Sequence, residues 1–219
     1  MKVSDLFYEE MEPALNEWLR RFGSAEEVFA AIPQLYEKLK SQSIQGDVED
    51  GAAIIGPIHV STGAVVRTQA IIRGPAIVGS HTVVSSHAEI QPGCFIGSKC
   101  IIGHGCSMVE SMVMNNTVIW PTAYIGHSLI GFGCIVGPSA VLGAKGLERT
   151  AAAAPRAAAD FGVILGDHSS VGASSILKPG TVVGPRTIIG EAILAAGTYG
   201  ADQTIATSQT LQIDGNSDD

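Results

Sequence analysis

Residues 64–79 read A-V-V-R-T-Q-A-I-I-R-G-P-A-I-V-G and repeat one arrangement every six residues. A bulky aliphatic residue recurs at Val66, Ile72 and Val78, and an alanine precedes each of them by two positions. Neither the 3.6-residue period of a helix nor the alternation of an ordinary strand produces this spacing. A six-residue period is typical of a parallel β-helix, in which each repeat contributes one short strand and one turn.

The same period extends on both sides of this stretch and predicts the inward side chains of the coil. Three repeats make one triangular coil, so residues eighteen apart are expected to stack. The small residues two positions earlier predict a second inward column. The bulky inward residues are predicted to be Val48, Ile54, Val60, Val66, Ile72, Val78, Val84, Ile90, Ile96, Ile102, Met108, Met114 and Trp120.

The period slips within residues 118–133, V-I-W-P-T-A-Y-I-G-H-S-L-I-G-F-G. The bulky column continues at Ile125 and Ile130, so two intervals of five place an irregularity at residues 120–130. Residues 143–162 then abandon the pattern, and we interpret them as a loop inserted into the coil. The repeat returns at Leu165 and fades after Tyr199.

The regions outside the repeat differ in composition. Helical spacing and a capping-box match at Ser24 predict two helices within residues 1–43, and Pro33 is expected to begin a third segment. We expect these helices to cover an end of the coil. The predicted organisation is a helical segment 1–43, an all-β solenoid 44–200 with the inserted loop 143–162, and a tail 201–219.

The charge and composition of the chain limit the classes of partner that it can bind. The chain of 219 residues has a net charge of −8 and a pI near 5.2, so its overall field repels nucleic acid and anionic membrane surfaces. Its first residues resemble no signal peptide, and no apolar run is long enough to cross a bilayer. We therefore expect a cytoplasmic protein with no nucleic-acid or membrane partner.

The four cysteines fall in the small inward column and are predicted to be inert core residues: Cys94, Cys100, Cys106 and Cys134.

Three stretches carry a resemblance to a known family: residues 64–79, residues 88–105 (A-E-I-Q-P-G-C-F-I-G-S-K-C-I-I-G-H-G) and residues 123–131 (A-Y-I-G-H-S-L-I-G). They resemble the hexapeptide-repeat acyltransferases. The likeness is greatest to the C-terminal domain of bifunctional sugar-1-phosphate nucleotidylyltransferases that also act as glucosamine-1-phosphate N-acetyltransferases. This resemblance implies a left-handed parallel β-helix and a homotrimer. No segment resembles the nucleotidylyltransferase domain, so we expect no uridylyl transfer.

The resemblance also implies a chemistry. Acyl groups pass from acetyl-CoA or another acyl-CoA, as co-substrate, to an amino sugar that carries a phosphate or a nucleotide. A free amine must lose a proton as it attacks a thioester, and an imidazole is suited to accept it. Tyr124 stands at a family position, and His127 replaces the aspartate three residues after it. We take His127 as the candidate base and Tyr124 as an orienting group.

Other residues are candidates for binding the sugar phosphate. Gln91 falls on a family arginine, while Val109 and Pro121 fall on a family lysine and on its catalytic histidine. Cationic side chains in the repeat and in the inserted loop complete the candidate set. The candidate substrate-binding residues are Gln91, Arg67, Arg73, Lys145, Arg149 and Arg156.

Two other functions remain open from the sequence. A non-catalytic sugar-phosphate binder or scaffold would explain the changed positions, with His127 exposed on a turn. A zinc enzyme of the γ-carbonic-anhydrase type would need three histidines, but no third one completes a set with His87 and His104. We therefore expect no metal, and interpret His59, His81 and His87 as turn residues facing solvent.

Overall fold

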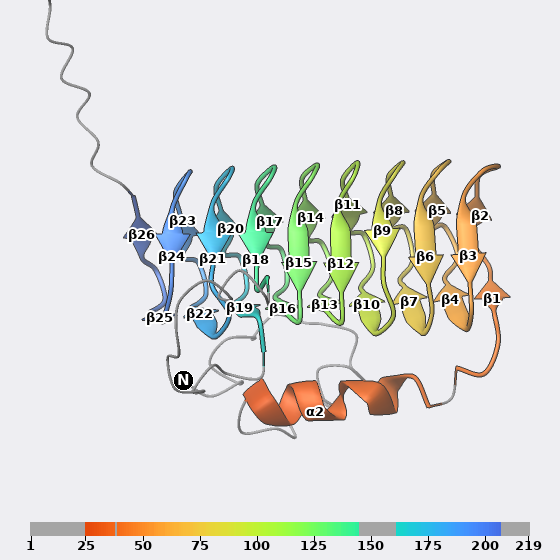
Figure 1. Ribbon diagram of the computed structural model, residues 1–219, viewed down its shortest axis with the longest axis horizontal. Helices are drawn as coiled ribbons and strands as arrows, with labels where there is room; N and C mark the ends of the chain where they lie inside the picture. The colour runs from red at the N-terminus through yellow and green to blue at the C-terminus, as the bar shows by residue number, and fades with distance from the viewer. Residues whose placement is uncertain (1–24, 38, 145–160, 207–219) are drawn as a thin grey trace, which may run out of the picture.

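The computed structural model describes residues 25–37, 39–144 and 161–206, which form one α-helix and a long parallel β-helix (Figure 1). The strands of the coil stack into three parallel sheets of nine, nine and eight strands. In the view of Figure 1 the chain runs down through β3 (Ala53–Ile55), across the bottom through β4 (Ile58–Val60) and up behind through β5 (Val65–Val66). Because the coil advances to the left in this view, it is left-handed. The predicted all-β solenoid is confirmed.

Each sheet is named here after its first strand. The β1 sheet contains β1 (Ser43–Ile44), β4 (Ile58–Val60), β7 (Ala76–Val78), β10 (Cys94–Ile96), β13 (Met112–Val113), β16 (Leu129–Ile130), β19 (Val163–Leu165), β22 (Thr181–Val183) and β25 (Thr198–Tyr199). The β2 sheet contains β2 (Asp47–Val48), β5 (Val65–Val66), β8 (Val83–Val84), β11 (Ile101–Ile102), β14 (Val118–Ile119), β17 (Ile135–Val136), β20 (Ser170–Val171), β23 (Ile188–Ile189) and β26 (Thr204–Ile205). The β3 sheet contains β3 (Ala53–Ile55), β6 (Ile71–Arg73), β9 (Glu89–Ile90), β12 (Ser107–Val109), β15 (Tyr124–Gly126), β18 (Val141–Leu142), β21 (Ile176–Leu177) and β24 (Leu194–Ala195).

The strand register explains the period. Val66 pairs with Val84, and Val84 pairs with Ile102, so equivalent residues stack directly above one another. Each inward column is therefore a continuous row of buried side chains. In the middle of the coil the spacing falls to 17, as in the pairs Ile102 with Ile119 and Ile119 with Val136, and the expected value of eighteen is wrong there.

Two predicted inward residues are wrong. Val113 and Ile119 take the inward column positions predicted for Met114 and Trp120; Met114 is nevertheless fully buried, whereas Trp120 is 50% exposed. The first interval of five therefore lies between Met108 and Val113, before the predicted irregularity. The second, from Ile125 to Ile130, lies where it was predicted.

Shorter corners explain the shift. After β9 the chain turns through three residues, 91–93, but after β12 it turns through two, Glu110 and Ser111. Ser111 thereby takes the small inward position that was predicted for Met112. Its buried hydroxyl donates to the carbonyl of Val109 at 2.7 Å, with that of Ile125 at 3.3 Å, and accepts from the N–H of Ser128 at 3.0 Å. The polar group is satisfied inside the core, so the shortened corner leaves no buried hydroxyl unpaired.

The predicted cysteine column is confirmed. All four thiols are free and buried. Burial raises the pKa of Cys94 and Cys134 to about 12 and that of Cys100 to about 11. A thiol with so high a pKa holds almost no thiolate at neutral pH, so these residues act as small core side chains.

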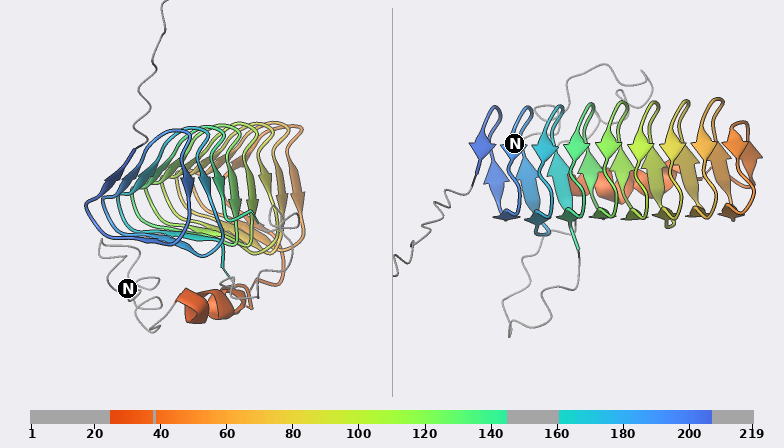
Figure 2. Two further views of the ribbon diagram at one scale, coloured as in Figure 1. Left: turned by 60° about the vertical axis from the view of Figure 1, so that its left-hand side comes forward. Right: turned by 90° about the horizontal axis from the view of Figure 1, so that it is seen from above.

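The helix α2 (Ala25–Leu35) lies along the outer face of the β1 sheet, and its axis runs along the long axis of the solenoid (Figures 1 and 2). The prediction that the helices cover an end is wrong for this one. Met112, Leu129 and Ile164 form a fully buried column on that outer face, since their strand neighbours point into the core. Such a column needs an apolar cover, and α2 buries Val28 and Ala31.

Two boundaries also differ from expectation. Pro33 lies inside α2 and does not begin a third segment. A proline in the last turn removes one backbone hydrogen bond of the helix, and the N–H of Tyr36 still donates to the carbonyl of Pro33 at 3.1 Å. Strand β26 lies within the predicted tail, and the N–H of Ile188 donates to the carbonyl of Gln203 at 2.8 Å. Within the described residues no helix is long and apolar enough to span a bilayer.

The observed register, with Ile119 inward and Trp120 outward, predicts losses of stability of different size at these two adjacent residues. Ile119→Ala removes a fully buried side chain and is expected to lower the free energy of unfolding by about 2–4 kcal/mol. Trp120→Ala removes a larger but half-exposed side chain and is expected to cost about 1 kcal/mol or less. Denaturant unfolding of both variants measures this, and a greater loss for Trp120→Ala would contradict the register.

Candidate functional site

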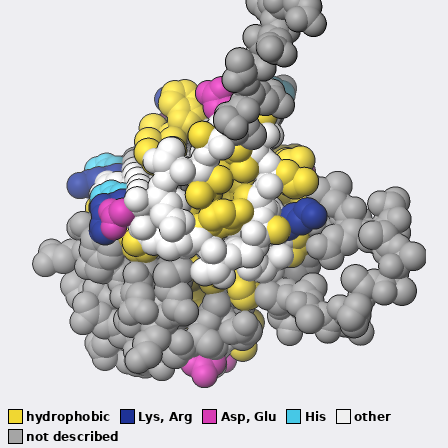
Figure 3. Space-filling model, turned by 90° about the vertical axis from the view of Figure 1, so that its left-hand side faces the viewer, with side chains coloured by type: hydrophobic (Ala, Val, Ile, Leu, Met, Phe, Trp, Pro, Cys, Tyr) yellow, Lys and Arg dark blue, Asp and Glu magenta, His cyan; other side chains and the backbone are white. Residues whose placement is uncertain are grey.

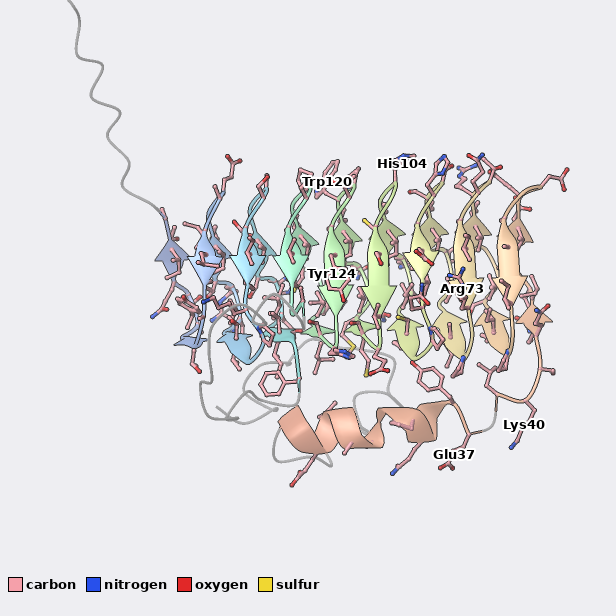
Figure 4. All side chains as sticks on the ribbon, viewed as in Figure 1. Glu37, Lys40, Arg73, His104, Trp120 and Tyr124 are labelled. Carbon is pink, nitrogen blue, oxygen red and sulfur yellow. The ribbon has the colours of Figure 1, made fainter. Side chains whose placement is uncertain are left out.

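Polar side chains gather on the outer face of the β3 sheet. The register pairs Ser107 with Glu89 on one side and with Tyr124 on the other. Arg73 of β6 forms an ion pair with Glu89, and the Gln91 side chain donates to the same carboxylate oxygen at 2.6 Å. Figure 4 shows Arg73 and Tyr124 on this face. The sheet thus brings three of the predicted site residues, Arg73, Gln91 and Tyr124, to one surface.

The edge of this face, where the chain passes from the β3 sheet to the β1 sheet, carries a histidine and a carboxylate. His127 follows β15 and Glu110 follows β12, and Val109 pairs with Gly126, so the two side chains lie on adjacent coils. His127 Nδ1 lies 3.0 Å from Glu110 Oε2. The imidazole is 23% exposed and the carboxylate 65% exposed. In the neutral ring, Nδ1–H donates to the carboxylate and Nε2 is the proton-accepting nitrogen.

The backbone at this corner is unusual in one respect. Glu110 and His127 have φ values of 43° and 48°, in the left-handed region that disfavours side chains. The other positive-φ residues described at this corner are glycines, namely Gly56, Gly93, Gly143, Gly180 and Gly197. Positive φ at a non-glycine residue is common at the other two corners of the coil, where twelve described residues adopt it. The pair is therefore distinctive for its corner, and the strain alone does not mark a site.

Tyr124 reaches toward His127. A Cβ placed on Gly126 would lie 2.8 Å from the Tyr124 hydroxyl, so the phenol covers the residue next to His127. Partial burial raises the pKa of Tyr124, which keeps the hydroxyl protonated and able to donate. The Tyr124 phenol thus lies over Gly126, the residue that precedes His127.

The inserted segment leaves and re-enters the coil at the same corner. The N–H of Gly162 donates to the carbonyl of His127 at 2.6 Å. The Ser128 hydroxyl donates to the carbonyl of Gly126 at 2.7 Å and accepts from the N–H of Val163 at 2.9 Å. These bonds fix the re-entering end beside His127, and the leaving end lies at the same corner, because a Cβ on Gly143 would clash with the carbonyl oxygen of Gly126. The predicted residues Lys145, Arg149 and Arg156 lie outside the described residues.

Arg67 does not join this site. It lies where the β2 sheet meets the β3 sheet and forms an ion pair with Glu49. The Glu49 carboxylate also accepts from the N–H of Thr68 at 2.9 Å, and these contacts hold its pKa below the usual value. His104 and the exposed Trp120 lie on the same edge (Figure 4).

Other histidines are remote from His127. His81 and His168 lie where the β1 sheet meets the β2 sheet, beside Lys99 and the pair of Arg186 with Asp202. Figure 3 shows histidine and charged side chains grouped along that corner. His59 lies in strand β4, so its predicted turn position is wrong. Among the described residues, no three potential ligands gather as a metal site.

Sequence reasoning missed Glu110. The signal was present, because Glu110 precedes His127 by 17 residues, which is one coil in this part of the chain. The expected spacing of eighteen hid the contact.

Comparison with known proteins places the chain in a family. The model of the GMPPB C-terminal domain matches residues 72–198, which is more than half of the chain. The chain belongs to the GMPPB C-terminal domain family. It is a hexapeptide-repeat β-helix of the acetyltransferase type, as the resemblance implied. The matched residues of this GMPPB-type domain include Arg73, Gln91, Glu110, Tyr124 and His127 but exclude Arg67 and α2.

Solved structures with a similar coil are distant in sequence. The UDP-N-acetylglucosamine acyltransferase of Francisella novicida is 15% identical with a TM-score of 0.41, over 77% of this chain and 66% of that one. The enzyme of the same name from Campylobacter jejuni is 14% identical with a TM-score of 0.35, over 75% and 68%. The present chain thus spans about two thirds of the length of these proteins. A search of curated protein sequences gave no match.

The contact between Glu110 and His127 predicts the tautomer of the histidine. Histidine ¹⁵N NMR at a pH where the ring is neutral is expected to show the proton on Nδ1. Glu110→Gln removes the charged acceptor and is expected to increase the Nε2–H tautomer, whereas Glu89→Gln is the matched control and leaves the spectrum of His127 unchanged. An Nε2–H tautomer in the unaltered protein would contradict the geometry.

Proposed function

We propose that this protein is a CoA-dependent acyltransferase, in the first instance an acetyltransferase, that modifies an amino sugar bearing a phosphate or a nucleotide. The observation that carries the proposal is the contact of His127 with Glu110 beside the Tyr124 hydroxyl. A base oriented by a carboxylate, next to a neutral donor, meets the needs of acyl transfer from a thioester. Membership of an acetyltransferase-type family supports the same class of reaction.

In the proposed reaction the sugar amine attacks the thioester carbonyl. Nε2 of His127 accepts the amine proton as the new C–N bond forms, and the Glu110 carboxylate stabilises the resulting imidazolium. Tyr124 donates a hydrogen bond to the sugar or to the developing oxyanion. When the C–S bond breaks, the imidazolium returns the proton and CoA leaves as the free thiol.

Recognition of the phosphate is assigned to the inserted segment. Arg73 already pairs with Glu89, so a phosphate there would have to displace a carboxylate. Lys145, Arg149 and Arg156 belong to a segment whose two ends lie beside His127. We propose these cations as the phosphate ligands, with Gln91 as a neutral donor on the floor of the site.

We also propose that the protein is a cytoplasmic homotrimer, as the resemblance implies. An exposed apolar row runs along the outer face of the β2 sheet and offers a surface for a second copy. Its members from Val65 to Ile135 pair in successive coils, Ser170 interrupts the row before Ile188, and Ile101, Ile135 and Ile188 are 46–48% exposed. The row comprises Val65, Val83, Ile101, Val118, Ile135 and Ile188.

A non-catalytic sugar-phosphate binder is the second candidate. The ion pairs that engage Arg67 and Arg73 favour its scaffold form, because they give these two side chains a structural role in the coil in place of phosphate binding. Calorimetry with CoA separates the candidates, because an acyltransferase must bind CoA and a sugar-phosphate scaffold need not.

Thiol release from acetyl-CoA in the presence of amino sugar phosphates and amino nucleotide sugars tests the proposed activity. His127→Ala is expected to lower kcat by about 100-fold or more, and Glu110→Gln by about tenfold with little change in KM. A thiol-reactive dye suits the assay, because the four cysteines of the protein are buried. His81→Ala, which removes an exposed histidine from another corner, is expected to leave the rate unchanged. Full activity in His127→Ala, or no turnover with any acceptor, would contradict the proposal.

Charge introduced into the apolar row tests the trimer. The double variant Ile101→Asp, Ile135→Asp is expected to sediment as a monomer, because it buries unpaired carboxylates in any interface formed there. Ile55→Asp changes an exposed residue of the β3 sheet and serves as the control. A monomeric unaltered protein, or a trimeric double variant, would rule out this interface.

A further inference from the structure

The edge where the β2 sheet meets the β3 sheet carries exposed aromatic rings on three successive coils. His87, His104 and Trp120 lie in the turns that follow β8, β11 and β14. The rings of His87 and His104 meet edge to face, with centroids 4.9 Å apart. Aromatic residues are only 5% of the chain, so an exposed tryptophan beside two imidazoles is a concentration of a scarce residue type. Figure 4 shows Trp120 and His104 together on this edge.

Trp120 stands between coils that present no side chain at the equivalent position. Ile119 pairs with Ile102 on one side and with Val136 on the other, so the neighbours of Trp120 in its column are Gly103 and Gly137. Beyond Gly137 the next coil presents Gly172 at the same position. No side chain of its own column therefore covers the indole, which is 50% exposed.

The glycines themselves have a structural cause. A Cβ on Gly103 would lie 2.6 Å from the backbone nitrogen of Pro121, and a Cβ on Gly137 would lie 2.7 Å from that of Ala173. Close packing of the corners therefore requires both glycines. The absence of side chains on either side of Trp120 in its column is a consequence of this packing and is present before any ligand binds.

Hydrogen-bonding groups lie in the turns around Trp120. His104 occupies the same turn position as Pro121 on the preceding coil, since the N–H of Thr122 donates to the carbonyl of His104 at 2.9 Å. On the other side the hydroxyls of Thr122 and Ser139 lie 2.8 Å apart and are exposed. An imidazole can donate to or accept from the edge of a heterocycle while its face remains apolar.

We propose that Trp120 and His104 form a subsite that stacks the nucleobase of a bound nucleotide. Base stacking on an aromatic side chain needs a flat exposed ring and tolerates any base, and this edge supplies that chemistry. The nucleobase has two possible sources, the adenine of CoA or the base of a nucleotide sugar. The choice of these two sources rests on the proposed function. The stacking surface itself does not depend on the reaction.

The position of the subsite suits either source. Trp120 and His127 lie at opposite edges of the β3 sheet, with Tyr124 between them on the same coil. Seven residues at about 3.3 Å each set an upper limit of about 23 Å between the two ends. A nucleotide whose base stacks on Trp120 can therefore extend across the β3 sheet, with its amine or its thioester directed to His127.

Tryptophan fluorescence provides a direct test. The chain has two tryptophans, so Trp18→Phe leaves Trp120 as the one reporting indole. This protein is titrated with adenosine 3′,5′-bisphosphate, UDP, GDP and, as the ligand without a base, ribose 5-phosphate. At least one nucleotide is expected to quench the emission, and ribose 5-phosphate is not. Quenching by the bisphosphate alone assigns the subsite to CoA, and quenching by UDP or GDP assigns it to the nucleotide sugar.

Calorimetry on variants completes the test. Trp120→Ala is expected to weaken binding of the quenching nucleotide about 10- to 100-fold. His104→Ala is expected to weaken it several-fold. Ile55→Ala, which shortens an equally exposed apolar side chain away from this edge, is the matched control with unchanged affinity. Trp120→Leu provides a second variant that retains apolar bulk, and thermal unfolding verifies that each variant folds.

Three results would overturn the inference: no quenching by any nucleotide, equal binding of ribose 5-phosphate, or unchanged affinity in Trp120→Ala and Trp120→Leu. If these variants instead change the sedimentation of the protein without affecting nucleotide binding, Trp120 belongs to a subunit contact and the subsite is wrong. The proposed function is judged separately. Acyl transfer with unchanged KM values in Trp120→Ala refutes the subsite alone, and stacking without turnover refutes the activity alone.

Discussion

The parallel hydrogen bonding between adjacent coils is the constraint on which the rest of the structure depends. Each strand bonds to the strand one coil earlier and one coil later, at a fixed spacing of about 4.8 Å. A residue therefore lies directly above its counterpart one coil away, and every choice of side chain becomes part of a column. The inward columns produce the core, and the outward columns determine which surfaces are apolar, polar or open.

The coil length decides which residues meet in these columns. A corner shortened by one residue after β12 places Ser111 in the small core column, Val113 in the bulky column and Glu110 above the position of His127. The same shortening turns Trp120 outward between two glycines. One change in a turn thus accounts for the site at one edge of the β3 sheet and the aromatic surface at the other.

The six-residue period was sufficient to predict the architecture and the buried cysteines, because those depend on composition and repetition alone. It could not decide between Met114 and Val113 or between Trp120 and Ile119, since both members of each pair are apolar and adjacent. The deciding information was the satisfied hydroxyl of Ser111, which is visible only in three dimensions. For the site, Tyr124 and His127 were found through resemblance and are adjacent in space, but Glu110 was missed because its contact depends on the shortened coil. Arg67 was assigned to the wrong place because the six-residue period does not show which corner of the coil lies beside the candidate site.

A double-mutant cycle on acyl transfer tests the central claim most directly, namely that Glu110 acts through His127. The cycle compares kcat for Glu110→Gln, His127→Ala and the combined variant. If the two residues work as a unit, the loss caused by Glu110→Gln disappears once His127 is alanine, and the combined variant is no slower than His127→Ala. If the two losses multiply in the combined variant, Glu110 acts independently and the one-coil contact is not the basis of the site.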